Sequence, residues 1–307
     1  MSRKFSCQNQ ETHACLENLA VKTSKDENIL AYNDSDAGMI IFTCNTNLQS
    51  LCDVDDIFID GTFKCCPKHF HQLYSIHGCK NGNYVPLLFA LLPSKEKAVY
   101  RTFWNVVFKL CDDQNLKFEP KTINLDFELG MVNLLREEFR EVEIKGCRLH
   151  LGQAWYRKIQ SLGLAQDYKD KSSEIGKWLS QFFGLPFLPP DETVDSFVEE
   201  MIPEAPTKER CSKFSDYLLE TYVDENSKYP PTMWASKPCS TAKRINNGPE
   251  CFHSHFNDQF YSAHPCIYVF IDVLKQIQTT TYIKIRGLDN PATVRRTEKE
   301  KLAFSLE

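Results

Sequence analysis

The 307-residue sequence lacks any hydrophobic run that approaches the roughly 18 consecutive apolar residues of a membrane span. The stretch from Met1 to Cys7 also lacks the apolar segment of a signal peptide. Basic residues are not in excess, since the formal net charge is −5 and the pI is about 6.0. These absences predict an intracellular protein without a membrane partner. Any contact with nucleic acid must depend on local basic patches.

Three groups of basic residues could form such patches. A solvated helix or loop face is the favoured interpretation of each group, and a phosphate-binding patch is the alternative. The groups are Arg157-Lys158, Lys243-Arg244, and Arg295-Arg296 with Lys299 and Lys301. The second and third are too short to identify a nuclear localisation signal.

The composition is that of a folded protein, with 42% apolar and 25% charged residues. The chain length favours one large domain with an insertion, or two domains. The 13 cysteines are an odd number in irregular spacing and include the adjacent pair Cys65-Cys66. This pattern favours reduced thiols over a secreted disulfide framework.

Strand patterns dominate the first half of the chain. Residues 1–28 are polar and predict a poorly ordered lead-in. Two apolar runs, 29–32 and 39–42, flank a turn-rich segment and predict a β-hairpin. The next elements are expected in the order β-β-β-α-β-α-β. Their predicted ranges are 56–60, 72–79, 84–92, 96–115, 121–126, 129–139 and 142–148.

This order predicts an α/β fold with a mixed sheet flanked by helices. Beyond residue 153 apolar residues fall at helical spacing between prolines, which predicts an all-α insertion. Closing helices are expected at 248–262 and 265–278, followed by a frayed tail. The expected organisation is a lead-in with a hairpin (1–50), a core (51–152), a helical insertion (153–240), closing helices (241–285) and a charged tail (286–307).

Three acidic residues lie in sequences suited to holding a metal ion. Asp60 and Asp126 each close an apolar run and are predicted at strand ends, and Glu250 follows Gly248-Pro249 in the first turn of a predicted helix. If the strands that carry the two aspartates are parallel neighbours, both carboxylates reach one edge of the sheet. Three such carboxylates can hold two divalent ions for phosphodiester chemistry. The alternatives are a turn residue for Asp60, a helix N-cap for Asp126 and a dipole-stabilised glutamate for Glu250.

Five short motifs in a shared order give the chain a resemblance to a known family. They are Asp60-Gly61-Thr62-Phe63, Tyr84-Val85-Pro86-Leu87-Leu88-Phe89-Ala90-Leu91-Leu92, Asp126-Phe127-Glu128, Cys147-Arg148-Leu149-His150 and Asn246-Asn247-Gly248-Pro249-Glu250-Cys251-Phe252-His253. Together they resemble the catalytic domain of Mutator-like element (MULE) transposases over most of the chain.

The resemblance implies an RNase H-like fold and a DDE transposase. Asp60, Asp126 and Glu250 would be its catalytic and metal-binding triad, with two Mg²⁺ or Mn²⁺ ions that activate water or a DNA 3′-hydroxyl. The implied partners are transposon terminal inverted repeats and target DNA, bound by a homo-oligomer in the nucleus. Glu128 is left outside the triad, as a neighbour of the site or a capping residue.

Cys147 and His150 have the spacing of half a zinc site. A structural zinc would need two further ligands, drawn from Cys239, Cys251, His253 and His255. Packing or hydrogen bonding beside the catalytic pocket is the favoured role, because the pair recurs next to the active site in the family that the chain resembles.

Three other residue groups have a composition that could bind a ligand. Cys65-Cys66-Pro67-Lys68-His69-Phe70-His71 is too closely spaced for a metal site and is expected to be a loop between strands. Cys7, His13 and Cys15 lack a second ligand pair for a zinc finger. The tryptophans of the insertion could stack on bases, although core packing is favoured. They are Trp155, Trp178 and Trp234.

The chain departs from the family pattern at two places. Residues 1–55 supply no DNA-binding zinc module, which suggests a truncated copy or a fragmentary gene model. Ile245 stands where the family commonly has threonine. A domesticated or decayed factor that binds DNA or proteins without transposition is therefore the alternative function. A host RNase H-like nuclease would fit the carboxylates but not the long helical insertion.

Overall fold

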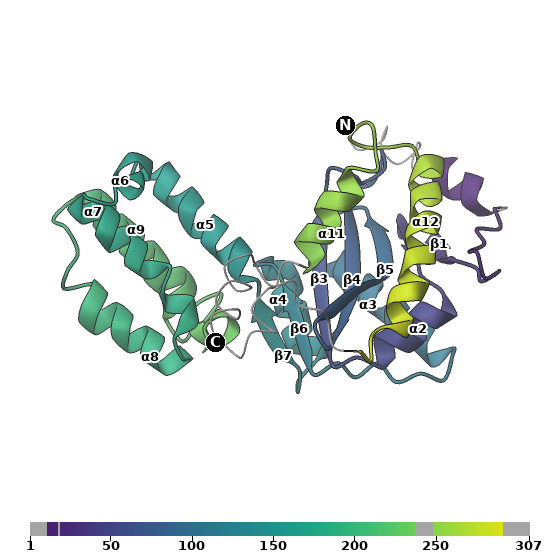
Figure 1. Ribbon diagram of the computed structural model, residues 1–307, viewed down its shortest axis with the longest axis horizontal. Coiled ribbons are helices and arrows are strands. Elements are labelled where there is room, and N and C mark those ends of the chain that lie inside the picture. The colour runs from purple at the N-terminus through teal and green to yellow at the C-terminus, as the bar shows by residue number, and fades with distance from the viewer. Residues whose placement is uncertain (1–10, 18, 237–247, 291–307) are drawn as a thin grey trace, which may run out of the picture.

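The computed structural model describes residues 11–17, 19–236 and 248–290. Their strands form one seven-stranded sheet in the order β1-β2-β5-β4-β3-β6-β7 (Figure 1). The strands are β1 (Leu30–Asp34), β2 (Met39–Phe42), β3 (Asp56–Thr62), β4 (Gln72–Lys80), β5 (Asn83–Leu92), β6 (Thr122–Leu125) and β7 (Glu143–Gly146).

The sheet is mixed. Strands β1, β2, β5, β4 and β3 pair antiparallel, and β3, β6 and β7 pair parallel. The tight turn from β4 to β5 is formed by Asn81 and Gly82, whose φ angles of 54° and 77° suit the left-handed turn that joins twisted hairpin strands. The arrangement confirms the predicted mixed α/β fold and is consistent with an RNase H-like fold.

Helices fill the connections between strands and most of the chain after β7. The first described helix covers residues 11–17. The others are α2 (Asn45–Cys52), α3 (Lys97–Asp112), α4 (Leu129–Glu138), α5 (Arg148–Ser161), α6 (Ala165–Lys169), α7 (Glu174–Phe182), α8 (Pro190–Asp195), α9 (Glu209–Leu218), α10 (Pro231–Trp234), α11 (Gly248–Asn257) and α12 (Ile267–Arg286). Short 3₁₀ and π segments, η1 (Leu185–Phe187), η2 (Ser196–Met201) and η3 (Leu219–Val223), lie between them. In Figure 1, α5 leads from the sheet into a lobe of helices, while α11 and α12 lie against the sheet.

The two faces of the sheet belong to two hydrophobic clusters, because successive strand residues point to opposite faces. In β2, Met39 and Ile41 join the cluster that contains α3, α4 and the lobe helices. Ile40 and Phe42 join the cluster that contains α12 and Phe256 of α11. The second cluster therefore holds α11 and α12 against the face opposite α3 and α4.

The structure corrects several predicted boundaries. The lead-in is not uniformly unstructured, since residues 11–17 are helical and Leu16 is fully buried in the second cluster. Helix α2 was not predicted. Helix α5 begins at Arg148, before the predicted start of the insertion, and α12 continues past 278 to Arg286. The tail from 291 onwards lies outside the described residues.

Other predictions are confirmed. The hairpin at β1 and β2, the meander of β3, β4 and β5, and the strands and helices up to β7 form as expected. Cys65 and Cys66 lie in the loop between β3 and β4 and are free thiols. In the described part of the chain, no helix combines the length and apolar character that a membrane crossing requires.

Candidate functional site

Asp60 and Asp126 are brought to the same face of the sheet by the parallel pairing of β3 with β6. In this pairing Phe58 lies opposite Asn124. Two residues further along each chain come Asp60 and Asp126, and a step of two keeps a side chain on the same face. The predicted parallel neighbours are thus confirmed, and the two carboxylates lie towards the carboxyl ends of adjacent strands.

Only one of the two aspartates lies at a strand end, as was predicted for both. Asp126 directly follows β6, as expected. Asp60 lies inside β3, because the strand continues through Gly61 and Thr62, which pair with β4. Asp126 is also not the N-cap of α4, since that position belongs to Glu128.

The two aspartates line one pocket of about 250 Å³. Its other lining residues come from the same strand ends, from the start of α5 and from the start of α11. The full set is Phe58, Ile59, Asp60, Asn124, Leu125, Asp126, Cys147, His150 and Pro249. Glu250 is the next residue after Pro249 and lies in the first turn of α11, as predicted. Its side chain lies outside the described part of the structure.

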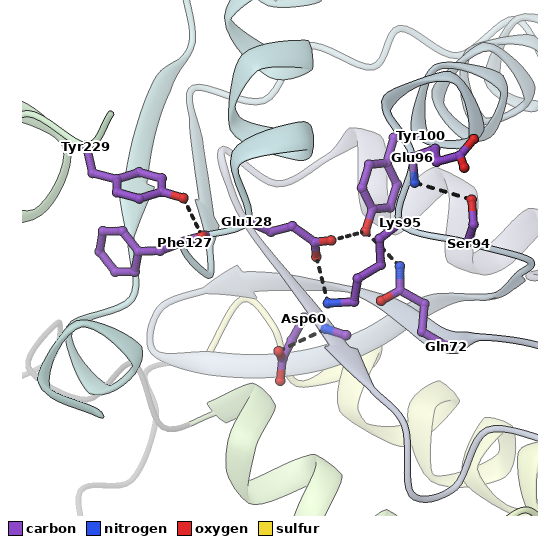
Figure 2. Close-up of polar contacts among 10 residues, drawn as sticks. Asp60, Gln72, Ser94, Lys95, Glu96, Tyr100, Phe127, Glu128 and Tyr229 are labelled. Carbon is purple, nitrogen blue, oxygen red and sulfur yellow. Dashed lines mark hydrogen bonds and ion pairs between the residues drawn. The ribbon is translucent and has the colours of Figure 1, made fainter. Parts of the chain in front are cut away.

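Asp60 is held by hydrogen bonds on both carboxylate oxygens. Oδ1 accepts the backbone N–H of Gly61 at 2.9 Å (Figure 2), and Oδ2 lies 2.7 Å from Nδ1 of His253 in α11. The His253 side chain is 8% exposed and that of Asp60 is 11% exposed. A buried carboxylate between two N–H donors is fixed in one orientation.

The contact between Asp60 and His253 belongs to a longer, buried series of hydrogen-bonded side chains. Nε2 of His253 lies 2.9 Å from Oγ of Ser75, which lies 3.0 Å from Nε2 of His77. Burial holds the pKa of His77 well below its usual range, so its ring is neutral. In one consistent arrangement His77 donates from Nε2 to Ser75, Ser75 donates to His253, and His253 donates from Nδ1 to Asp60. Nδ1 of His77 then has no hydrogen-bond partner among the described residues.

Asp126 lies in an environment that disfavours its negative charge. Burial, followed by the charges of Glu128 and Asp60, raises the pKa of Asp126 to about 6. The charges of His150 and Lys95 act in the opposite direction. A carboxyl group with a raised pKa beside a second carboxylate is a feature of functional sites, since a bound cation would relieve the repulsion.

Glu128 takes no part in the pocket lined by the two aspartates. Its Oε1 accepts the hydroxyl of Tyr100 at 2.7 Å, and its Oε2 lies 3.4 Å from Nζ of Lys95 (Figure 2). It occupies the N-cap position of α4 but makes no capping hydrogen bond. Both carboxylate oxygens of Glu128 thus have partners outside that pocket.

The donor set of the pocket fits a hard divalent cation. Asp60 and Asp126 supply carboxylate oxygens, which Mg²⁺ and Mn²⁺ prefer. Among the residues that the structure describes, no three histidine, cysteine or acidic side chains form a metal-binding group. The third carboxylate of the predicted triad, that of Glu250, lies outside this set.

The predicted Cys-x-x-His pair lies at the rim of the same pocket. Cys147 is buried, and Nδ1 of His150 is buried without a hydrogen-bond partner among the described residues. Of the further zinc ligands considered, His253 contacts Asp60, Cys251 and His255 are exposed, and Cys239 lies outside the described residues.

The insertion tryptophans do not face solvent. Trp155, Trp178 and Trp234 are 1%, 3% and 3% exposed and pack in the first cluster. Core packing is therefore confirmed for all three. The basic groups at 243–244 and 295–301 lie outside the described residues.

Gly146 lies at the end of β7. A substitution at this position tests how tightly the residues beside the pocket are packed. A Cβ at this position would lie 2.8 Å from Cε1 of Phe127 and closer still to its Cζ. Phe127 cannot yield easily, because its ring packs on Tyr229, whose hydroxyl donates to the Phe127 carbonyl at 2.6 Å (Figure 2). Gly146→Ala is expected to lower the free energy of unfolding by about 1–3 kcal/mol, as overpacking does.

Because Phe127 adjoins Asp126, the same substitution is expected to weaken metal binding. Urea unfolding and a Mn²⁺ titration measure the two effects. The matched control is Gly152→Ala in α5, where the nearest neighbour of a new Cβ is 3.8 Å away. That variant should be as stable as the native chain or slightly more stable. Equal stability of both variants would contradict the proposed packing constraint.

The fold and the pocket together describe an α/β protein with two carboxylates at the ends of adjacent parallel strands. Comparison with known families matches residues 57–154 to the MULE transposase domain. The matched segment contains Asp60, Asp126, Cys147 and His150. It supports the assignment to the MULE family and a transposase-family function, which implies DNA binding in general. No curated protein matches the chain.

Proposed function

We propose that this chain is the catalytic domain of a MULE-type DDE transposase, which cleaves DNA phosphodiesters and transfers strands in a metal-dependent reaction. One observation carries the proposal: Asp60 and Asp126 share a pocket with the start of α11, the helix that contains Glu250. A carboxylate cluster assembled from two strands and a distant helix has the composition that divalent ions require.

In this proposal Asp60, Asp126 and Glu250 hold two Mg²⁺ or Mn²⁺ ions. When bound, the ions would supply an activated water or 3′-hydroxyl and stabilise charge on the phosphate. His253 orients Asp60 through its Nδ1–H and prevents rotation of the carboxylate. Asp126 gives up its proton more readily once a cation offsets the charges of Glu128 and Asp60.

The finer parts of the proposal follow from the resemblance to MULE transposases. The substrates are transposon terminal inverted repeats and target DNA, the active form is a homo-oligomer assembled on DNA, and the protein acts in the nucleus. Helices α5 to α10 correspond to the insertion that separates the second aspartate from the glutamate.

Binding of Mn²⁺ tests the metal site without knowledge of the DNA sequence. Electron paramagnetic resonance of a Mn²⁺ titration should show saturable binding by the native chain. Asp60→Asn and Asp126→Asn are each expected to weaken Mn²⁺ binding by more than about 100-fold. Mutation of a residue that only hydrogen-bonds to a metal ligand already lowers metal affinity by about 10–100-fold. Asp112→Asn, an exposed change at the end of α3, is the control.

Two outcomes would contradict the metal-site proposal. One is Mn²⁺ binding that is the same in the native chain and in both aspartate variants. The other is the absence of saturable binding by a folded native chain, which would favour the alternative of a transposase-derived factor without catalysis.

A further inference from the structure

A second and larger hollow adjoins the catalytic pocket. It is an open groove of about 1380 Å³ between the sheet and the lobe helices, whereas the catalytic pocket has about 250 Å³. Asp126 and His150 line both hollows, so the groove opens directly onto the candidate active site.

One wall of the groove is a single face of α5. Its lining residues His150, Ala154, Arg157, Lys158 and Ser161 recur every three or four positions, as residues on one helical face do. At a rise of 1.5 Å per residue this face is about 16 Å long. It leads away from the catalytic pocket towards the helical lobe (Figure 1).

The other wall is formed by Tyr217 of α9, by η3 and by the segment before α10. Tyr222 and Tyr229 are buried there, at 3% and 7% exposure, so their rings are not available for stacking on bases. The ammonium group of Lys158 lies 4.6 Å from the centre of the Tyr217 ring and connects the two walls. A ligand in the groove would therefore meet positively charged side chains and not the faces of these aromatic rings.

The charge of the groove differs from that of the whole chain, whose net charge is −5. Three of its cations, Arg157, Lys158 and Lys228, form no ion pair with a carboxylate in the described part of the chain. The fourth, Lys95, is paired with Glu128. Positive charge that no carboxylate neutralises thus collects beside a site proposed to act on phosphodiesters, where phosphate groups would neutralise it.

We propose that this groove binds the backbone of the DNA strand that leads away from the scissile phosphate. Arg157, Lys158 and Lys228 contact its phosphates. The inference rests on the proposed function, which makes DNA the substrate of the adjoining pocket. A strand carries one phosphate per 3.4 Å of duplex axis, so a 16 Å wall spans about four or five phosphates. Contacts of this kind position DNA without reading its sequence.

The test is a fluorescence-anisotropy titration of a labelled DNA oligonucleotide that carries a candidate element end, in EDTA so that no cleavage occurs. The groove variant combines Arg157→Gln, Lys158→Gln and Lys228→Gln. It is expected to bind at least about 10-fold more weakly at 100 mM salt. With a duplex oligonucleotide, the slope of log K against log salt should decrease in magnitude by about 3, at about 0.9 for each of the lost contacts.

The matched control removes the same charge from the opposite end of the sheet, with Lys109→Gln, Lys117→Gln and Lys121→Gln. These lysines are exposed, and β6 begins next to Lys121, at the end of the strand away from Asp126. At 100 mM salt, charges beyond about 10 Å are largely screened, so the control should bind DNA as the native chain does. Thermal unfolding of each variant establishes that it is folded.

Asp126→Asn separates this inference from the proposed function, because it should lose metal-dependent cleavage and still bind DNA. Native affinity in the groove variant, or equal weakening in the control, would overturn the groove inference and leave the metal-site proposal untouched. Tighter binding to RNA of the same sequence, lost in the groove variant, would overturn the assignment to DNA.

Discussion

Asp126→Asn is expected to raise the free energy of unfolding of the metal-free protein at pH 8, although it should abolish DNA cleavage. Burial and the charges of Glu128 and Asp60 raise the pKa of Asp126 from 3.8 to about 6. The native state therefore disfavours the ionised carboxylate. At about 1.4 kcal/mol for each pKa unit, removing this charge should stabilise the fold by on the order of 1–3 kcal/mol.

The pH dependence has a definite sign. The pKa of Asp126 is higher in the folded state than in the unfolded state. At a pH between these two values, the native state keeps a proton that the unfolded state has released. This contribution to stability is fully present below about pH 4 and is lost as the pH rises through about 6. The stability advantage of Asp126→Asn should therefore be large at pH 8 and should vanish near pH 4.

Urea unfolding in EDTA at several pH values measures this effect, with Asp112→Asn as the control. Adding Mn²⁺ should stabilise the native chain and not Asp126→Asn, because a ligand stabilises only the state that binds it. An Asp126→Asn variant that is less stable than the native chain at pH 8 would identify this carboxylate as a structural group instead of a functional one.

Loss of the His253 ring is expected to have the second largest effect. His253→Ala removes the donor to Asp60 Oδ2 and leaves a buried carboxylate oxygen without that partner. Removal of a group that orients a metal ligand typically costs 10–100-fold in metal affinity or activity. We expect a loss in this range in both Mn²⁺ affinity and DNA cleavage.

Conservative variants of His253 separate orientation of Asp60 from simple packing. The amide nitrogen of His253→Asn can replace Nδ1, which contacts Asp60, whereas that of His253→Gln can replace Nε2, which contacts Ser75. His253→Asn should therefore retain more activity and more Mn²⁺ affinity than His253→Gln or His253→Ala. Equal losses in all three variants would mean that His253 acts through packing alone.

Short apolar runs predict most of the sheet, because strands that are buried on both faces are apolar at nearly every position. The position of Asp126 after β6 follows from the same pattern. The continuation of β3 past Asp60 does not, since Gly61 and Thr62 are polar or small and belong to the strand only through pairing with β4. Helix boundaries near 148 and 286 depend on tertiary packing that a local pattern does not contain.

The partner of Asp60 shows what sequence reasoning missed at the site. His253 lies three residues after Glu250, so both share one face of a helix, and this spacing was an available signal. Ser75 and His77 gave no such signal. They contribute to the hydrogen-bonded series at Asp60 only because β4 pairs with β3 and places Ser75 opposite Asp60. Arg157-Lys158 was recognised as a basic pair, but its place beside the pocket depends on the direction of α5.

The most direct test of the central claim is Mg²⁺- or Mn²⁺-dependent cleavage of DNA that carries candidate element ends. The native chain would be compared with Asp60→Asn, Asp126→Asn and Glu250→Gln. We predict cleavage by the native chain and its loss in all three variants, with DNA binding retained. Cleavage that persists in the variants, or no cleavage by a folded native chain supplied with a DNA-binding module, would contradict the account.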